Sequence, residues 1–99
     1  TLAVITQITL KLIPKPKFKK TYMGIFPDVE KAMNAVFKSL SNGASPVAME
    51  FLDALVIEAL RKKLGVNLPK DAGAILVGDV DGSSIDEVNT QMEILNQSF

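Results

Sequence analysis

The sequence predicts one α+β domain in which short strands alternate with helices. Its 99 residues are the size of a single domain with one hydrophobic core. Four short segments have the alternating or continuous apolar pattern of strands, and three others repeat apolar residues every three or four positions, as helices do. Hydrophobic residues make up 47% of the chain and charged residues 22%, a balance that argues against intrinsic disorder and low-complexity polymers.

The first predicted strand covers residues 2–12, where apolar side chains recur at every second position and β-branched residues are frequent. Pro14 and Pro16 then remove backbone donors and favour extended geometry, so residues 13–17 predict a stiff junction. The charge changes close by: residues 1–20 carry five lysines and no acid, whereas residues 21–99 carry six bases and eleven acids. A charge split of this kind often marks a join.

A second strand is predicted over about residues 18–26, and the best helix of the chain follows it. Asp28 suits the N-cap of this helix, and Asn42 with Gly43 closes it. Its apolar residues recur at helical spacing: Val29, Ala32, Met33, Val36, Phe37 and Leu40. After Pro46, residues 47–52 alternate as a third strand that enters a helix near Asp53.

That second helix ends at Gly65, which suits a left-handed stop. Because its apolar stripe is broad, we expect it to be largely covered; the stripe is Leu55, Val56, Ala59, Leu60 and Leu64. Residues 74–80 are nearly all apolar and suit a central strand. Ser84 and Glu87 match a capping box that opens the last helix, whose predicted buried stripe is Ile85, Val88, Met92, Leu95 and Phe99.

From residue 18 onward the order is strand, helix, strand, helix, strand, helix. Without the middle helix, read as an insertion, the order is βαββα, a ferredoxin-like plait lacking its final strand. The predicted fold is therefore an α+β ferredoxin-like plait fragment, βαβ(α)βα, with an extra N-terminal strand. The missing strand leaves an open edge, to be covered by the N-terminal strand, another chain or residues of a parent protein, and we expect a homodimer through this edge.

The composition removes most catalytic constellations. With no Cys and no His, the chain has no thiol nucleophile, no imidazole base and no zinc-finger ligand set, so we predict no catalytic residue and no metal site. A net charge of zero gives no case for a nucleic-acid partner. No apolar run reaches the roughly 20 residues that span a bilayer, so we expect no transmembrane segment and a cytoplasmic protein, or one peripheral to the membrane in a longer parent.

Three local features have both a chemical and a structural interpretation. Residues 78–84 are rich in oxygen ligands, but their register does not fit a calcium loop and suits a turn before a helix cap. Glu50 and Asp53 are close carboxylates that could exchange protons, yet Asp53 is well placed as a cap. The lysines between residues 15 and 20 could bind phosphates, but only Phe18 interleaves with them, which favours a solvated linker.

The N-terminal residues are Thr1-Leu2-Ala3-Val4-Ile5-Thr6, followed by Thr9-Leu10-Lys11-Leu12-Ile13-Pro14-Lys15-Pro16. This pattern closely resembles the end of the flavin domain in FAD-linked oxidases of the glycolate oxidase D-subunit and D-lactate dehydrogenase type. Residues 48–53 look like the family's Ala-x-Glu-(Phe or Leu)-(Met or Leu)-Asp passage. Residues 76–82 are similar to its strand that ends in Asp-Gly before a helix.

The resemblance implies that residues 1–17 are the end strand of the flavin domain and the junction, and that residues 18–99 are the first part of the substrate-side cap domain. It implies that Thr1, Ala3, Val4 and Ile5 contact FAD in an intact parent, with Ala3 in place of a family glycine. The implied parent oxidises a 2-hydroxy acid, of glycolate or D-lactate type, to a 2-oxo acid and passes electrons to a separate acceptor. We expect the chain alone to be an inactive scaffold that does not retain FAD.

The alternative is a non-enzymatic ferredoxin-like module that binds a small ligand or drives assembly, because such plaits host many functions. A module of that kind gives no reason for the flavin-domain pattern at the N-terminus or for the charge change after Lys20. These two features favour the flavoenzyme fragment. Stoichiometric flavin bound to the isolated chain would contradict the expectation that the fragment alone does not hold the cofactor.

Overall fold

The computed structural model describes residues 2–99. Three strands, β1 (Phe18–Phe26), β2 (Ala48–Asp53) and β3 (Ala74–Gly82), alternate with three helices, α1 (Val29–Ser41), α2 (Ala54–Leu64) and α3 (Ile85–Ser98). The predicted α+β class and the order of these six elements are confirmed. Each strand and helix lies within a few residues of its predicted position.

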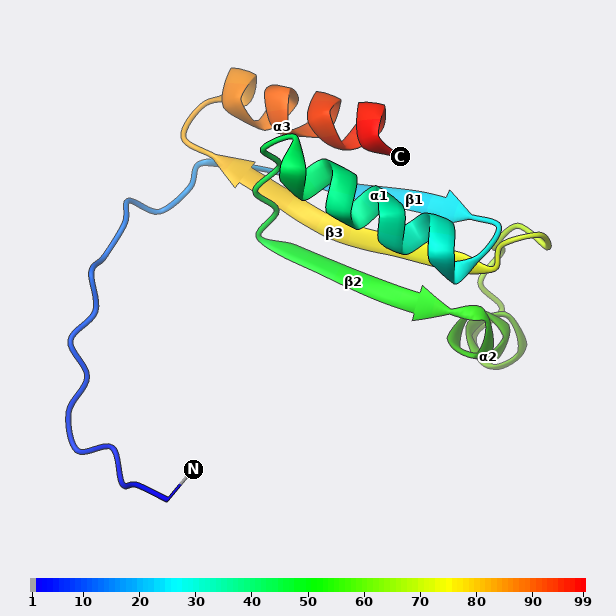
Figure 1. Cartoon of the computed structure of the whole chain (residues 1–99), viewed down its shortest axis with the longest axis horizontal. Helices are drawn as coiled ribbons and strands as arrows, with labels where there is room; N and C mark the ends of the chain where they lie inside the picture. Colours follow the sequence, from blue (N-terminus) through cyan, green and yellow to red (C-terminus); the bar gives the residue numbers. More distant parts are fainter. Residues whose placement is uncertain (1) are drawn as a thin grey trace.

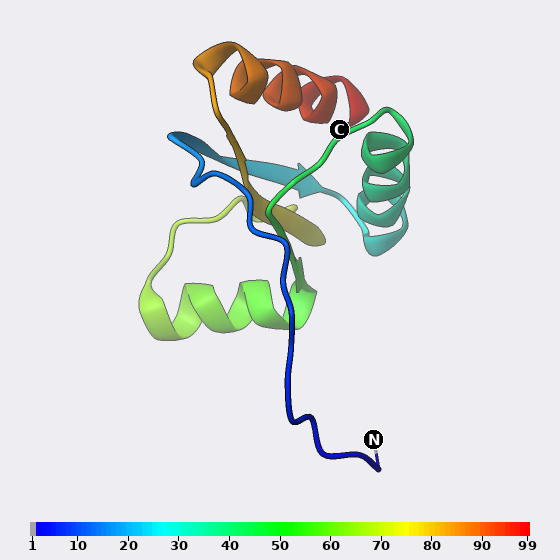
Figure 2. The same ribbon diagram turned by 90° about the vertical axis from the view of Figure 1, so that its left-hand side faces the viewer.

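The strands form one open antiparallel sheet in the order β1-β3-β2, with the predicted central strand in the middle. Helices α1 and α3 lie on one face of this sheet and α2 lies on the other (Figures 1 and 2). Residues directly opposite each other in an antiparallel pair share a face. Tyr22, Gly78 and Met49 are opposite one another and belong to the face covered by α1 and α3, whereas Thr21, Asp79 and Ala48 belong to the other, here called the open face.

The prediction of a strand over residues 2–12 is wrong for this chain. Residues 2–17 form no strand, and they extend away from the folded body (Figure 1). The side chains of Leu2, Val4 and Leu12 are almost fully exposed. An alternating pattern fixes the two faces of a strand, but a strand also needs a neighbour for its backbone groups, and this segment has none among the described residues.

Each helix begins at its predicted cap. The side chains of Asp28, Asp53 and Ser84 accept hydrogen bonds from the backbone N–H three residues further on, a contact typically worth about 1 kcal/mol. Glu87 accepts a 2.8 Å hydrogen bond from the backbone N–H of Ser83, so the return contact of the predicted capping box goes to the residue before the cap and not to Ser84 itself. Gly65 ends α2 with a φ of 62°, the left-handed stop that the sequence predicted.

On the face covered by α1 and α3, the core consists of two clusters of buried residues, one packed against α3 and one packed against α1. Val88 and Leu95 of α3 are buried against Tyr22 and Val80, as the predicted stripe required, with Met92 and Phe99 packed beside them. Ile85 is the exception in this stripe, because it lies at the first turn and is about half exposed. A third, smaller cluster joins α2 to the open face through three buried residues: Ile57, Ala72 and Ile75.

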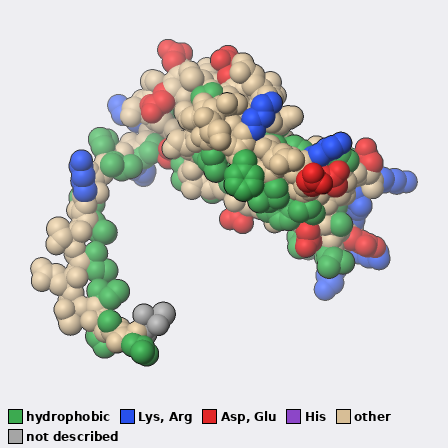
Figure 3. All heavy atoms as spheres, in the orientation of Figure 1, with side chains coloured by type: hydrophobic (Ala, Val, Ile, Leu, Met, Phe, Trp, Pro, Cys, Tyr) green, Lys and Arg blue, Asp and Glu red, His purple; other side chains and the backbone are tan. Residues whose placement is uncertain are grey.

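Helices α1 and α2 turn much of their apolar surface outward. On α1 the buried residues are small (Ala32, Ala35 and Ser39), whereas Phe37 is 65% exposed. The expectation that α2 is largely covered was wrong, since only Ile57 of this helix is buried and Leu55 is 77% exposed. Among the strands and helices, α2 packs chiefly against β2 and β3, and the loop that follows it adds contacts from Leu68 and Ala72. Figure 3 shows hydrophobic side chains gathered over α1 and β2.

Candidate functional site

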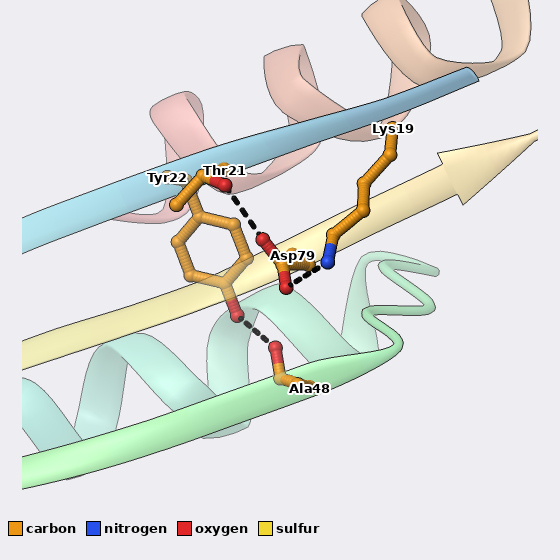
Figure 4. Close-up of polar contacts among 5 residues, drawn as sticks. All are labelled: Lys19, Thr21, Tyr22, Ala48 and Asp79. Atoms are coloured by element: carbon orange, nitrogen blue, oxygen red, sulfur yellow. Dashed lines mark hydrogen bonds and ion pairs between the residues drawn. The ribbon is translucent and has the colours of Figure 1, made fainter.

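A cluster of polar side chains lies on the open face of the sheet around Asp79 (Figure 4). Thr21, directly opposite on β1, donates a 2.7 Å hydrogen bond from its hydroxyl to Oδ1 of Asp79. The Nζ atom of Lys19 lies 2.7 Å from Oδ2 of the same carboxylate. The three residues meet because they alternate on adjacent antiparallel strands, where side chains of one face stand side by side.

These contacts hold the pKa of Asp79 below its ordinary value, first through the hydrogen bond from Lys19 and then through that from Thr21. Both oxygens of the carboxylate are therefore engaged by donors, and its negative charge is neutralised by Lys19. A carboxylate in this state is a poor proton acceptor, because general bases near neutral pH need a raised pKa. The cluster accordingly joins β1 to β3.

Tyr22 forms a second polar contact, on the opposite face of the sheet. Its hydroxyl donates a 3.1 Å hydrogen bond to the backbone oxygen of Ala48, so the side chain joins β1 to β2 across the central strand (Figure 4). Gly78 lies beneath this contact, and a Cβ there would collide with the Tyr22 hydroxyl and the Ala48 oxygen. Burial, followed by the nearby charge of Asp79, raises the pKa of Tyr22.

The residues expected to contact flavin do not belong to either cluster. Ala3, Val4 and Ile5 lie on the extended N-terminal segment, where they are exposed, and Thr1 lies outside the described residues. Their implied role therefore stays a prediction. An exposed extended backbone can offer N–H and C=O groups to a cofactor held elsewhere, but this segment alone does not enclose one.

The structure supports the interpretation of Asp53 as a helix cap and that of residues 78–84 as a segment without a calcium loop. Asp53 caps α2 through a 2.9 Å hydrogen bond from the backbone of Val56, while Glu50 is exposed in the middle of β2. Residues 78–82 belong to β3, so they form no cation loop. Among the described residues, no group of three or more acidic side chains is placed to hold a metal ion.

Some of the lysines near the start of β1 form polar contacts with the folded body. Lys19 pairs with Asp79, and Lys20 donates a 2.6 Å hydrogen bond to the side-chain oxygen of Asn89 on α3. Lys15 and Lys17 lie on the exposed segment before β1. Lys15 and Lys17 thus agree with the solvated-linker interpretation, whereas Lys19 and Lys20 are part of β1 and make contacts with the folded body.

A cleft of about 480 Å³ lies between α1, the end of β1 and the C-terminal residue. Its apolar lining includes Phe26 and Phe99, and Lys31 and Lys38 stand on the α1 side. The one hydroxyl in the lining, that of Ser98, donates a 2.7 Å hydrogen bond to a backbone oxygen of its own helix. The cleft therefore brings together no nucleophile and base.

Sequence reasoning missed the contacts of Tyr22, Thr21 and Lys19, although one signal pointed to them. Gly78 lies in the middle of the central strand, and a strand glycine commonly marks the close approach of another group. The group here is the Tyr22 side chain. The side chain that lies over Gly78 is set by the register between β1 and β3. That register depends on how the two strands pair in the folded protein, which the local sequence does not specify.

Within residues 2–99, no helix combines the length and apolar character needed to cross a membrane. This agrees with the absence of a long apolar run in the sequence.

The sequence of this chain matches a known protein family. The family described as FAD linked oxidases, C-terminal domain, matches residues 15–99 of this chain. That range contains all six strands and helices together with the last residues of the proline-bearing junction.

Three curated relatives are similar over most of the chain. Glycolate oxidase subunit GlcD of Escherichia coli strain K12 is 39% identical over 85 residues, which are 86% of this chain and 17% of the relative. Glycolate oxidase subunit GlcD of Bacillus subtilis is 30% identical over 82 residues, 83% of this chain and 17% of the relative. A D-lactate dehydrogenase of Anaerostipes hadrus is 30% identical over 99 residues, 94% of this chain and 21% of the relative. The chain spans about a fifth of the length of these relatives.

Proposed function

Because the chain belongs to the FAD-linked oxidase C-terminal domain family, we propose that it is a scaffold part of the cap domain of an FAD-dependent oxidoreductase. The observation that carries this proposal is the family match over residues 15–99, which includes the whole folded body. The chain's own polar groups fit a scaffold. Those of Asp79, Tyr22 and Asp53 are used in contacts that hold strands and helices together.

The proposed parent reaction is the oxidation of a 2-hydroxy acid to a 2-oxo acid. Its support is that the relatives carry the names glycolate oxidase and D-lactate dehydrogenase, and glycolate and D-lactate are both 2-hydroxy acids. The flavin, when bound in the parent, accepts the hydride from the substrate and passes the electrons to a separate acceptor. The residues of this chain contribute by holding the shape of the domain that faces the substrate.

We assign residues 1–17 to the end of the flavin domain and the junction, and residues 18–99 to the first part of the cap domain. The different packing of the two parts supports this division. Residues 18–99 contain all the buried apolar residues described above, whereas residues 2–16 are exposed throughout. In the parent, the flavin domain would supply the neighbour that residues 2–12 lack, and Thr1, Ala3, Val4 and Ile5 would lie along the cofactor.

The cap part is proposed to be a ferredoxin-like plait without its final strand. The strand order β1-β3-β2, with α1 and α3 on one face, is consistent with such a plait, and α2 is the insertion between β2 and β3. The missing strand would pair with the free edge of β1. The ring of Phe99 packs on the helix-covered face of the same strand, against Tyr22 and Phe26.

A segment exchange tests the proposal. The matching 85-residue stretch of the Escherichia coli subunit is replaced by the corresponding residues of this chain, and the flavin content of the purified exchange protein is measured. We expect one flavin per protein, because the scaffold should restore the domain. A folded exchange protein that loses its flavin would count against the proposal.

The isolated 99-residue chain provides the companion measurement. We expect it to bind no flavin and to oxidise neither glycolate nor D-lactate, since the exposed segment of residues 2–17 cannot enclose a cofactor. Stoichiometric flavin on the isolated chain would contradict the fragment interpretation. It would favour the alternative of an independent ligand-binding module.

A further inference from the structure

Two hollows lie against β1, an edge strand of the sheet, and they share the side chain of Phe99. The smaller hollow, of about 230 Å³, is lined by residues 21–23 of β1 and by residues of α3 that include Met92. The larger is the cleft of about 480 Å³ described above, which is lined by residues 25–27 at the other end of the strand. Phe99 lines both. The second half of β1 is therefore hollowed on either side of one aromatic ring.

The same half of β1 carries no charged side chain. Lysine on an edge strand opposes the addition of another strand, and the lysines of β1 are confined to its start. There the side chain of Lys19 contacts Asp79 on the open face, and that of Lys20 contacts Asn89 of α3. From Thr21 to Phe26 the strand is uncharged. This stretch of the edge can therefore accept a further strand.

The pairing geometry says which side chains of an added strand would meet the hollows. All strand pairs of this sheet are antiparallel, and purely antiparallel sheets are over-represented, so the added strand is taken to run opposite to β1. Residues directly opposite each other share a face, so those opposite Tyr22 and Phe26 would lie on the helix-covered face. The first would lie by the smaller hollow and the second by the cleft. The residue between them is opposite Gly24, beside the Phe99 ring, which suits a small side chain.

The cleft has one cationic wall. Lys31 and Lys38 line it from α1, and Nζ of Lys38 donates a 3.3 Å hydrogen bond to the backbone oxygen of Gln97. Within residues 2–99, neither lysine lies at ion-pair distance from a carboxylate. The aromatic rings of Phe26 and Phe99 supply apolar surface in the same cleft. A glutamate fits this combination, because its methylene groups can pack on the rings while its carboxylate accepts charge-assisted hydrogen bonds from the lysines.

We propose that the free edge of β1 binds an extended segment from the remainder of the parent oxidase, with a glutamate opposite Phe26 and an apolar residue opposite Tyr22. The source of the segment rests on the proposed function, in which this chain is about a fifth of a longer protein. Backbone hydrogen bonds along the edge supply affinity, and side chains seated in alternate pockets supply specificity. The glutamate pairs with Lys31 and Lys38, and the apolar residue fills the hollow beside Met92.

Disulfide trapping of a synthetic peptide tests the edge and the register, because the chain has no cysteine of its own. The probe is the blocked peptide Glu-Val-Ala-Cys-Leu-Thr, whose cysteine lies opposite Met23 when its glutamate is opposite Phe26. Opposite Cα atoms are about 4.5–5.5 Å apart, which a disulfide can bridge. The chain carrying Met23→Cys is compared with Glu50→Cys, the matched position on the other edge strand, since both residues are opposite Val77.

The peptide should form the mixed disulfide with Met23→Cys at least about tenfold faster than with Glu50→Cys, after each rate is divided by the rate with blocked cysteine alone. Adding Lys31→Glu and Lys38→Glu should slow trapping about fivefold, and a peptide with lysine in place of its glutamate should recover the rate. The matched control is Lys63→Glu with Lys70→Glu, which changes the net charge equally outside the cleft and should leave trapping unchanged. Circular dichroism checks that every variant remains folded.

Equal trapping at residues 23 and 50 would overturn the inference, as would trapping that ignores the charges of Lys31 and Lys38. A Met23→Cys chain that cross-links to itself faster than to the peptide at equal concentration would place a second copy on this edge and would also overturn it. The trapping uses this chain and a synthetic peptide only. Loss of flavin from the exchange protein would therefore contradict the proposed function without changing the trapping rates, and the two failures can be told apart.

Discussion

The ring of Phe99 occupies the space directly above Gly24. A Cβ placed on Gly24 would come within 2.5 Å of Cδ2 of that ring, closer than real side-chain contacts allow. The ring lies between two further aromatic residues, with centroids 5.9 Å from Tyr22 and 5.4 Å from Phe26, both in edge-to-face geometry. Phe99 thus packs on β1 because Gly24 has no side chain beneath the ring and because Tyr22 and Phe26 flank the ring on its two sides.

Gly24→Ala should destabilise the fold by about 1–3 kcal/mol, because the added methyl group forces the Phe99 ring out of its site. The measurement is the free energy of unfolding from urea titration. Phe99→Ala removes the nearer obstacle and leaves the Phe26 ring, whose Cε2 atom would lie 2.9 Å from the added Cβ, so in that background Gly24→Ala should cost less but not become neutral. Equal costs in the two backgrounds would show that the ring is not what Gly24 accommodates.

Tyr22 should ionise at higher pH than a free tyrosine. Burial and the charge of Asp79 raise its pKa, so the folded state favours the neutral phenol. Its contribution to stability is then complete below the ordinary tyrosine pKa and is lost as pH rises through the raised folded value. Because the chain has one tyrosine, absorbance of the tyrosinate gives the midpoint without ambiguity. A midpoint at or below the ordinary value would contradict the buried contact with Ala48.

Asp79 should stabilise the fold in its ionised form. Its pKa is lowered by Lys19 and Thr21, so its contribution is present above the ordinary aspartate pKa and is lost as pH falls through the lowered folded value. Asp79→Asn should therefore flatten the acid limb of the stability profile, measured by urea titration at a series of acidic pH values. Stability that falls equally steeply at acidic pH in Asp79→Asn and in the unmodified chain would contradict this role of Asp79.

Asp53→Ala should cost about 1 kcal/mol of stability, because it removes the cap of α2. Glu50→Ala should change stability by no more than about 0.5 kcal/mol, as is usual for exposed surface positions. Thermal or urea unfolding separates the two effects. If both substitutions had the same large effect and the double variant were not additive, the two carboxylates would be coupled, and their assignment to separate roles would be wrong.

The local signals of the sequence predicted the element positions well. Asp28, Asp53 and Ser84 cap their helices as predicted, since a cap depends on a side chain and a backbone N–H three residues away. Gly65 ends α2 for the same kind of local reason. The central position of β3 was also predictable, because a nearly continuous apolar run needs cover on both faces.

The features that were missed depend on contacts between distant residues. Residues 2–12 have the alternation of a strand, but the pattern does not say whether a neighbour is present. The spacing of Met33, Phe37 and Leu40 predicts an apolar face, but not that the smaller Ala32 and Ala35 approach the sheet in their place. The Tyr22 contact across Gly78 requires the register of three strands, which no local segment contains.

The central claim is that this chain can serve as the scaffold of an FAD-linked oxidase C-terminal domain. Its most direct test is substrate-dependent reduction of the flavin in the Escherichia coli exchange protein, followed by absorbance without an external electron acceptor. We predict that glycolate or D-lactate bleaches the bound flavin, and that the same exchange carrying Ile75→Asp, at a fully buried position, does not support reduction. A folded exchange protein that holds its flavin but is reduced by neither acid would contradict the claim.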